Sequence, residues 1–338
     1  MRWDYLKRKK HILVLVCFLI CFAVLFNIAS TMANINRRVS GNILSWVDFK
    51  VTAAAMEDAF NYDVESQNGE YQIDWIDLLA CLGARYGGDF KKYSRSHMDQ
   101  LASRLKAGES IEQITADMKY FSYYRTAYQA VLGGMVGEYS IQTEASLGGT
   151  PEYETKYGLK AYSPVAYGYT FSHCDDFGNS RSYGYKRKHL GHDLMGNVGT
   201  PIINVETCVV EAVGWNQYGG WRIGLRSLDG RRYYYYAHLR KGHPYALELK
   251  EGEIVYAGDV IGYMGMTGYS LNEDYNGMSV PHLHFGMQLI FEESQKDTNE
   301  IWIDTYEIVK FLEHHKCPVV KGSGDDYVRK YLYSEGIE

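Results

Sequence analysis

The chain has 338 residues, of which 46% are hydrophobic, and this length exceeds that of a usual single domain. Two modules and an accessory segment are therefore expected. The formal net charge is −6, and the first ten residues carry five basic and one acidic side chain, so the rest of the chain carries −10. This acidic balance argues against nucleic acid as a partner.

The first 30 residues predict a membrane segment. Five basic residues precede an almost uninterrupted apolar run from Ile12 to Ala29, close to the roughly 20 residues that span a bilayer. We therefore expect a cytoplasmic tail at 1–10, a transmembrane anchor at 11–30 and the remaining chain outside the cell membrane, because basic residues favour the cytoplasmic side. This predicts a single-pass membrane protein with a cytoplasmic amino terminus. A cleavable signal peptide ending at Ala33 is the alternative.

Residues 31–150 predict an α-helical exported module of unknown role. From about residue 42 to 140, apolar residues recur at helical spacing. Ser96 is expected to open one helix, and Ser110 and Ser122 are expected to open the next two. The many aromatic residues here are interpreted as helix-packing residues rather than as a carbohydrate-binding face.

After residue 150 the sequence predicts an antiparallel sheet. Gly, Asn and Asp separate short runs rich in Val, Ile, Tyr and Thr. Residues 227–232, "SLDGRR", are expected to form a hairpin turn. Residues 301–316 return to helical spacing. The predicted β-rich domain covers 151–320, which leaves 321–338 as a tail.

The cysteines predict neither a zinc ribbon nor a dense disulfide scaffold. Six are present, and two of them lie in the apolar run. The other four are widely spaced and form no C-x-x-C motif, so their disulfide state stays open. They are Cys81, Cys174, Cys208 and Cys317.

Two separated clusters of histidine and aspartate predict a metal site. In "KHLGHDLMG", His189 and Asp193 lie four residues apart, a spacing that brings both side chains to one side of a helix or an extended strand. In "SVPHLHFGMQLIF", which reads as a strand, His282 and His284 project from the same face. Three such ligands with one open position are typical of catalytic zinc. The strand pattern alone does not decide which of the two later histidines is the third ligand.

The order of these motifs resembles the lysostaphin-type (LytM-like) zinc metalloendopeptidases, which cut peptide cross-links of bacterial cell walls. H-x-x-x-D and, about 90 residues later, H-x-H stand in the family's order with "GTPI", "YYYYAHL", "EIVYAGDVIGYMGMTG" and "PHLHFGM". The resemblance covers roughly residues 160 to 295, and the anchor suggests a membrane-anchored, clostridial-type member. It implies a β-rich, open-barrel peptidase domain, the family's duplicated hybrid motif. The expected fold class is therefore α+β, with a transmembrane helix, a helical module and this domain.

The family pattern gives the site residues distinct roles. It makes His189, Asp193 and His284 the ligands of one Zn²⁺ ion per chain, and His238 and His282 the unliganded catalytic pair. The implied reaction is peptide hydrolysis by zinc-activated water. The catalytic pair would stabilise the oxyanion, and one member would pass a proton to the leaving amine.

Other residues near the motifs keep more than one interpretation. His192 is expected to turn into the core, with orientation of a ligand through its ring N–H as the alternative. A family tyrosine that precedes the first ligand corresponds to Tyr183 or Tyr185. An inserted polar loop between the "TG" and the H-x-H carries Glu273 and Asp274, which would either meet an amino group of the substrate or simply be solvated.

The expected function is that of a zinc endopeptidase which hydrolyses peptide cross-links of peptidoglycan at the outer face of the membrane. Its expected partners are peptidoglycan peptide stems and, through one helix, the membrane; a protein partner for the helical module is left open. The alternative is a non-catalytic wall-binding or scaffold protein of the same fold, for example in sporulation or division. Such members lack metal or catalytic residues, whereas all five are present here.

Overall fold

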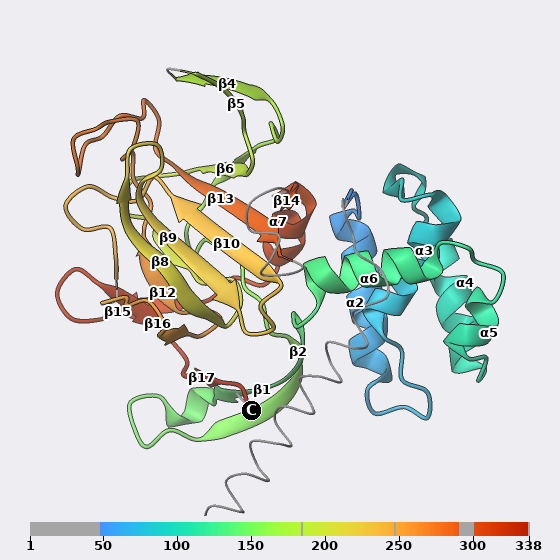
Figure 1. The fold of residues 1–338 in the computed structure, drawn as a ribbon. Coiled ribbons are helices and arrows are strands. Elements are labelled where there is room, and N and C mark those ends of the chain that lie inside the picture. Colours follow the sequence, from blue (N-terminus) through green and yellow to red (C-terminus); the bar gives the residue numbers. More distant parts are fainter. Residues whose placement is uncertain (1–47, 184, 247, 291–300, 337–338) are drawn as a thin grey trace, which may run out of the picture. The chain divides into compact units, whose positions relative to one another are not determined.

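The structure is a computed structural model, and it describes residues 48–183, 185–246, 248–290 and 301–336 (Figure 1). The predicted tail and anchor at 1–30 lie outside these residues. No helix in the described ranges is long and apolar enough to cross a membrane. The longest of them, α2, has 14 residues, fewer than the roughly 20 that a bilayer requires. This finding contradicts the predicted single-pass location in the cell membrane.

The amino-terminal part of the described chain is helical, as the sequence predicted. Its elements are α2 (Ala53–Ser66), α3 (Trp75–Tyr86), η1 (Phe90–Lys92), α4 (Arg95–Lys106), α5 (Ile111–Thr115) and α6 (Phe121–Leu132). Ser110 opens α5 with a complete capping box. The other two predicted starts differ. Ser96 lies inside α4, where its hydroxyl bonds that of Ser94 rather than a backbone N–H, and Ser122 lies inside α6.

Helix α3 is the buried centre of this helical part. The Asp74 carboxylate caps it by accepting hydrogen bonds from the N–H groups of Ile76 and Asp77. Ten of its 12 residues are buried, since α2, α4 and α6 all contact it. Trp75 and Tyr128 are almost completely buried, which confirms the packing interpretation for these two aromatic residues.

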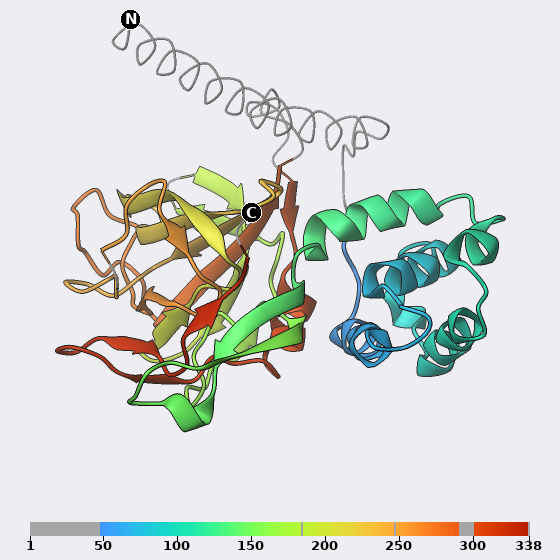
Figure 2. The same ribbon diagram turned by 90° about the horizontal axis from the view of Figure 1, so that it is seen from below.

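The carboxy-terminal part is built on an antiparallel sheet with strand order β11-β8-β9-β10-β13-β6-β3, and β14 pairs with β13 (Figures 1 and 2). The strands are β3 (Ser172–Cys174), β6 (His192–Met195), β8 (Cys208–Asn216), β9 (Gly220–Ser227), β10 (Arg232–Ala237), β11 (Ile254–Val255), β13 (His282–Leu289) and β14 (Ile301–Ile303). The predicted hairpin turn joins β9 to β10. The path ends at β11 and β3, so the described sheet does not close into a barrel. The mixed helical and β-rich class is confirmed.

Four smaller sheets of two or three strands are also present in the described residues. They are β1 (Val136–Gln142) with β2 (Tyr153–Leu159) and β17 (Tyr333–Ser334), β4 (Ser180–Tyr183) with β5 (Tyr185–Lys188), β7 (Pro201–Ile203) with β12 (Val260–Tyr263), and β15 (Val319–Lys321) with β16 (Tyr327–Arg329). Strand therefore begins before residue 150, and the segment predicted as a tail supplies β16 and β17. The expected helix over 301–316 divides into β14 and the shorter α7 (Tyr306–Leu312).

The tyrosine run of β10 shows how the sheet separates its core from its site. Tyr234 and Tyr236 are fully buried and pack against the ring of Phe285 on β13, with centroids 6.1 and 5.3 Å apart. Tyr233 and Tyr235 project from the opposite face, because side chains alternate along a strand. On that face they line a pocket.

A buried ion pair joins this sheet to the helical part. The Arg232 guanidinium donates to both carboxylate oxygens of Glu206, at 2.9 and 2.7 Å, and to the Ala130 carbonyl of α6 at 3.1 Å. The Tyr234 hydroxyl donates to the same carboxylate at 2.5 Å. Only 1% of the Arg232 side chain is exposed, so both charges depend on these partners for their solvation.

Replacing Arg232 should therefore be costly. Arg232→Met leaves Glu206 buried without its cation, and we expect the free energy of unfolding to fall by about 3–5 kcal/mol in urea titrations. Arg226→Met is the matched control, because Arg226 makes the same two-pronged contact with Glu211 but that carboxylate is 46% exposed. The control should lose about 0.2–1 kcal/mol. Equal losses in the two variants would contradict this account of the buried pair.

Candidate active site

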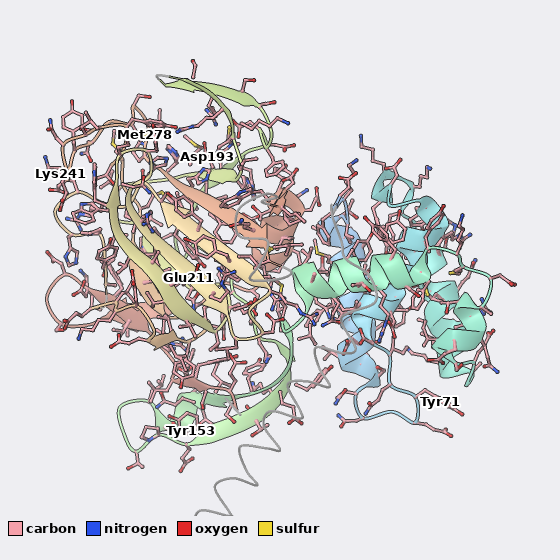
Figure 3. The ribbon with its side chains drawn as sticks, viewed as in Figure 1. Tyr71, Tyr153, Asp193, Glu211, Lys241 and Met278 are labelled. Atoms are coloured by element: carbon pink, nitrogen blue, oxygen red, sulfur yellow. The ribbon has the colours of Figure 1, made fainter. Side chains whose placement is uncertain are left out.

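Strands β6 and β13 bring the two sequence clusters together. In their antiparallel register Asp193 lies directly opposite His284, so both side chains project from the same face. His189 comes from the short segment between β5 and β6, and its backbone N–H is held by the Asn179 carbonyl at 2.9 Å. Figure 3 places Asp193 at the end of the sheet near the β4–β5 hairpin.

The three side chains meet as a small triangle of donor atoms. His189 Nε2 lies 3.0 Å from Asp193 Oδ1 and 2.9 Å from His284 Nδ1, and the last two atoms lie 3.0 Å apart. A tetrahedral zinc ion with bonds of about 2.0–2.1 Å separates its ligand atoms by about 3.3 Å. Two imidazoles and one carboxylate at this spacing therefore fit a zinc ion.

The charges of the cluster are consistent with a cation site. Burial works to raise the pKa of Asp193, but the neighbouring imidazoles of His189 and His284 together outweigh burial and hold that pKa well below its usual range. The carboxylate is thus ionised at neutral pH. Burial lowers the pKa of His284 and outweighs the opposing effect of Asp193, so this imidazole is neutral and able to act as a ligand.

Asp176 is a site residue that the sequence interpretation missed. Its carboxylate pairs with Nδ1 of His189 at 2.7 Å, and a carboxylate oxygen can only accept, so this nitrogen carries the proton and Nε2 keeps its lone pair for a metal. Arg181 in turn contacts Asp176 and lies 3.0 Å from Asp193. The only sequence signal was an aspartate 13 residues before the first ligand, which no local pattern distinguishes.

Two further histidines stand beside the triangle. Nδ1 of His238 donates to the Thr267 carbonyl at 2.8 Å, and Nδ1 of His282 donates to the Val280 carbonyl at 2.9 Å. A carbonyl can only accept, so each neutral ring keeps its Nε2 lone pair free. The two ring centroids lie 4.8 Å apart. Burial, with His282 and His284 close by, holds the pKa of His238 well below its usual value.

The backbone at His238 is in a conformation that non-glycine residues rarely adopt. Its φ of 62° lies in the left-handed region, and its N–H donates to the Gly219 carbonyl at 2.7 Å. Such positions cost on the order of 1–3 kcal/mol and are often found at functional sites. Here it carries the chain from the end of β10 toward the pocket.

The structure places His192 away from this cluster, as the sequence predicted. It is buried on the opposite face of β6, where its ring stacks on His173 at 4.9 Å and contacts Tyr306. The side chains of Tyr183 and Tyr185 lie outside what the structure describes, so the choice between them stays a prediction.

The inserted loop supports the pocket wall instead of offering a carboxylate to it. Asp274 accepts hydrogen bonds from the Trp221 indole N–H and from the Gly242 N–H, both at 2.8 Å. Glu273 is exposed, and neither acid lines the pocket. The expectation that they meet an amino group of the substrate therefore has no support in this arrangement.

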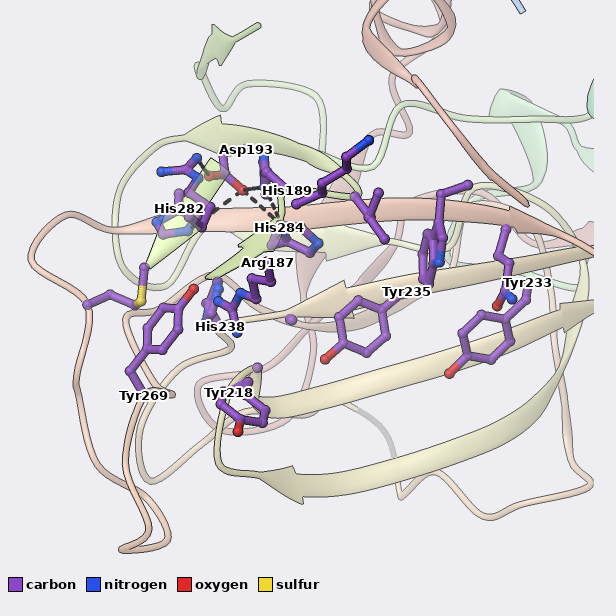
Figure 4. A pocket seen from close by; sticks show the side chains of 18 residues that line it. Arg187, His189, Asp193, Tyr218, Tyr233, Tyr235, His238, Tyr269, His282 and His284 are labelled. Atoms are coloured by element: carbon purple, nitrogen blue, oxygen red, sulfur yellow. Dashed lines mark hydrogen bonds and ion pairs between the residues drawn. The ribbon is translucent and has the colours of Figure 1, made fainter. Parts of the chain in front are cut away.

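A pocket of about 460 Å³ lies over the cluster (Figure 4). Its floor contains all five histidine and aspartate residues of the predicted site. Its walls are aromatic and basic, with contributions from the turn between β8 and β9, from β10, from the β4–β5 hairpin and from the inserted loop. Around the metal cluster, the lining includes Arg181, Arg187, Lys188, Tyr218 and Tyr269.

Comparison with known proteins agrees with this geometry. Residues 187–298 match the model of peptidase family M23. L-Ala--D-Glu endopeptidase of Bacillus subtilis (strain 168) is 40% identical over 117 residues, which make up 35% of this chain and 34% of that protein. Lysostaphin of Staphylococcus simulans is 39% identical over 98 residues, 29% of this chain and 17% of lysostaphin.

A solved structure shows the same fold over a longer stretch. The lytM protein of Ruminococcus gnavus ATCC 29149, for which glycyl-glycine endopeptidase activity has been suggested, superposes with a TM-score of 0.53. The match covers 84% of this chain and 95% of that one at 22% identity. It therefore extends well beyond the segment that matches the family model.

Residues 187–298 of this chain thus match peptidase family M23, which confirms the resemblance to the LytM-like family that the motifs predicted. The membrane-anchored, clostridial-type part of that prediction is not confirmed. M23 peptidases are zinc metallopeptidases, and the His–Asp–His cluster has the donor atoms that zinc prefers, so the zinc prediction is confirmed as well. The chain spans about a third of the length of the Bacillus relative that it matches.

The Asp176 contact leads to a test of metal affinity. Asp176→Asn removes the carboxylate that orients His189, and we expect zinc affinity to fall about 10- to 100-fold in competition titrations with a chelator. Asp326→Asn is the matched control, since Asp326 forms a similar 2.7 Å pair with His243 outside the pocket. It should leave zinc affinity unchanged. An Asp176→Asn protein with wild-type affinity would remove this residue from the site.

Proposed function

We propose that the protein is a zinc-dependent endopeptidase that hydrolyses peptide bonds of bacterial peptidoglycan. The observation that carries the proposal is the meeting of two imidazoles and one carboxylate at mutual distances of about 3 Å, beside a second pair of histidines on a pocket floor. The name of the Bacillus relative, an L-Ala--D-Glu endopeptidase, supports the reaction class and specifies a bond.

We assign His189 Nε2, Asp193 Oδ1 and His284 Nδ1 as the three protein ligands of one zinc ion. A bound zinc ion supplies Lewis acidity, which polarises a carbonyl and makes water more acidic. This assignment chooses His284 over His282 for a geometric reason. His284 faces Asp193 directly across the strand pair, whereas His282 Nε2 lies 3.9 Å from the Asp193 carboxylate.

His238 and His282 are assigned as the catalytic pair. Each ring is anchored through Nδ1–H to a backbone carbonyl and presents a basic Nε2. Either ring can take a proton from the attacking water. The protonated ring then donates to the oxyanion or to the departing amine. Because the pKa of His238 is held low, its imidazolium would give up a proton readily.

The alternative of a non-catalytic wall-binding or scaffold protein has less support. Loss of catalysis would remove the need for any of the five residues to keep its geometry. Here three donor atoms converge, and both remaining histidines carry the tautomer that leaves a basic nitrogen free. Peptide stems of peptidoglycan are therefore the proposed substrate.

Digestion of purified peptidoglycan tests the metal assignment. The protein with zinc should release fragments with new amino termini, and mass analysis of those fragments would name the bond. A chelator should stop the release. The variants His189→Ala, Asp193→Ala and His284→Ala should lose both zinc and hydrolysis, because too few ligands remain.

The control for these variants is His243→Ala, a histidine outside the pocket that should keep both properties. Stoichiometric zinc in the His189→Ala protein would remove that ligand from the assignment. Absence of any cleavage by the zinc-loaded wild type would overturn the proposed function.

The catalytic pair should behave differently from the ligands. His238→Ala and His282→Ala should keep zinc near full occupancy and lose about 10²- to 10⁴-fold in kcat, because acid–base groups act on the transition state. His192→Asn should keep the chemistry and change only stability or, modestly, metal affinity. Zinc loss in His282→Ala together with zinc retention in His284→Ala would show that the two roles are exchanged.

A further inference from the structure

The pocket is cationic although the chain is acidic. Three basic side chains line it, Arg181, Arg187 and Lys188, and all three come from the β4–β5 hairpin. Among the residues that the structure describes, Asp193 is the carboxylate in its lining, and the proposed function assigns this residue to zinc. The whole chain has a net charge of −6, so this concentration of positive charge is a local feature of the pocket.

The three cations are not equivalent. Arg181 contacts the carboxylates of Asp176 and Asp193. In the described ranges, no ion pair within 4.0 Å is found for Arg187 or Lys188. These two positive charges are therefore available to a ligand.

Arg187 is held in place by aromatic rings. Its guanidinium carbon lies 4.8 Å from the ring centroid of Tyr269 and 5.3 Å from that of Tyr218. A guanidinium over ring faces keeps its N–H donors in its own plane, where a carboxylate can accept two of them side by side. The contact thus positions the cation without neutralising its charge.

This cation lies next to the reacting groups. The ring of Tyr269 also stacks on His238, with centroids 5.8 Å apart and planes inclined by 28°. Arg187, Tyr269 and His238 therefore form a continuous series of contacts on one side of the pocket (Figure 4). A substrate group that reaches Arg187 would belong to a residue close to the scissile amide.

We propose that Arg187, assisted by Lys188, binds a free carboxylate of the substrate residue next to the scissile bond. The inference rests on the proposed function and says which peptide bond the enzyme prefers. A glutamyl residue keeps one carboxyl group free whichever of its two carboxyls continues the chain, whereas glycine has none. The site therefore selects a bond beside a glutamyl residue over a glycyl-glycine bond.

A pair of peptides that differ by one group tests this selectivity. One is a stem peptide with a free glutamyl carboxylate beside the scissile bond, and the other carries the carboxamide at that position. The zinc-loaded wild type should cleave the carboxylate peptide with a kcat/KM about 10- to 100-fold higher, as a charge-assisted contact implies. Arg187→Gln should lower kcat/KM for the carboxylate peptide much more than for the carboxamide peptide, so that the preference between the two peptides is lost.

Two further variants and a third substrate test whether the preference depends on the Arg187 charge and on the substrate carboxylate. Arg187→Lys keeps the charge and should retain part of the preference, which a purely structural role would not explain. Arg231→Gln removes a cation outside the pocket and should behave as wild type. Zinc content is measured for every variant, so that loss of the metal site is recognised. Pentaglycine should be cleaved more slowly than the carboxylate peptide.

The outcomes separate the inference from the function on which it rests. If the wild type cleaves both stem peptides at one rate, or prefers pentaglycine, the carboxylate site is wrong while the endopeptidase proposal stands. A wild-type preference that survives in zinc-loaded Arg187→Gln would also overturn the role of Arg187. If no peptide and no peptidoglycan is cleaved, the proposed function itself fails.

Discussion

The register between β6 and β13 is the constraint on which the candidate active site depends. It sets Asp193 opposite His284 and, one residue further along, His192 opposite Phe285. Because side chains alternate, a slip of one residue would turn the aspartate into the core and expose His192. Burial of Phe285 against Tyr236 opposes such a slip, so packing on one face of the sheet determines which residues meet on the other.

The polar residues of the site are connected by a series of contacts, and each contact orients the next residue. Arg181 contacts Asp176, Asp176 fixes the tautomer of His189, and His189 directs its free nitrogen at Asp193 and His284. Groups buried this far need partners, since an unpaired charge in the interior is costly. A metal ion would neutralise the carboxylate and satisfy the facing nitrogens at the same time. Arg232 and Glu206 likewise need each other because both charges are buried, and their pair joins the sheet to α6.

On the proposed function, the β4–β5 hairpin contributes both to the metal cluster and to substrate recognition. Arg181 on its first strand supports the carboxylates around the metal cluster, while Arg187 on its second strand reaches the aromatic wall. One short basic element can thus stabilise the cluster and attract a carboxylate to it. Charges on a partly enclosed wall act more strongly than the same charges in open solvent, because less water screens them.

Local features of this protein follow from short-range patterns in its sequence. Alternation predicted that His282 and His284 share a face, and the Asn, Asp and Gly punctuation predicted the sheet and the turn between β9 and β10. The spacing of His189 and Asp193 indicated that their two side chains lie on the same side of the chain. These features follow from the backbone periods of helix and strand, which depend only on neighbouring residues.

Contacts between distant segments could not be read from these short-range patterns. The family pattern already pointed to His284 as the third ligand, and the position of Asp193 across the strand pair adds a geometric argument for that assignment. The proposed roles of Asp176 and Arg187 rest on contacts that no sequence period encodes. The pairing of β17 with β1, nearly 200 residues apart, likewise turned a predicted tail into part of a sheet. Such contacts are set by burial and hydrogen bonding over the whole chain, because each strand edge and each buried polar group takes the partner that the complete fold brings to it.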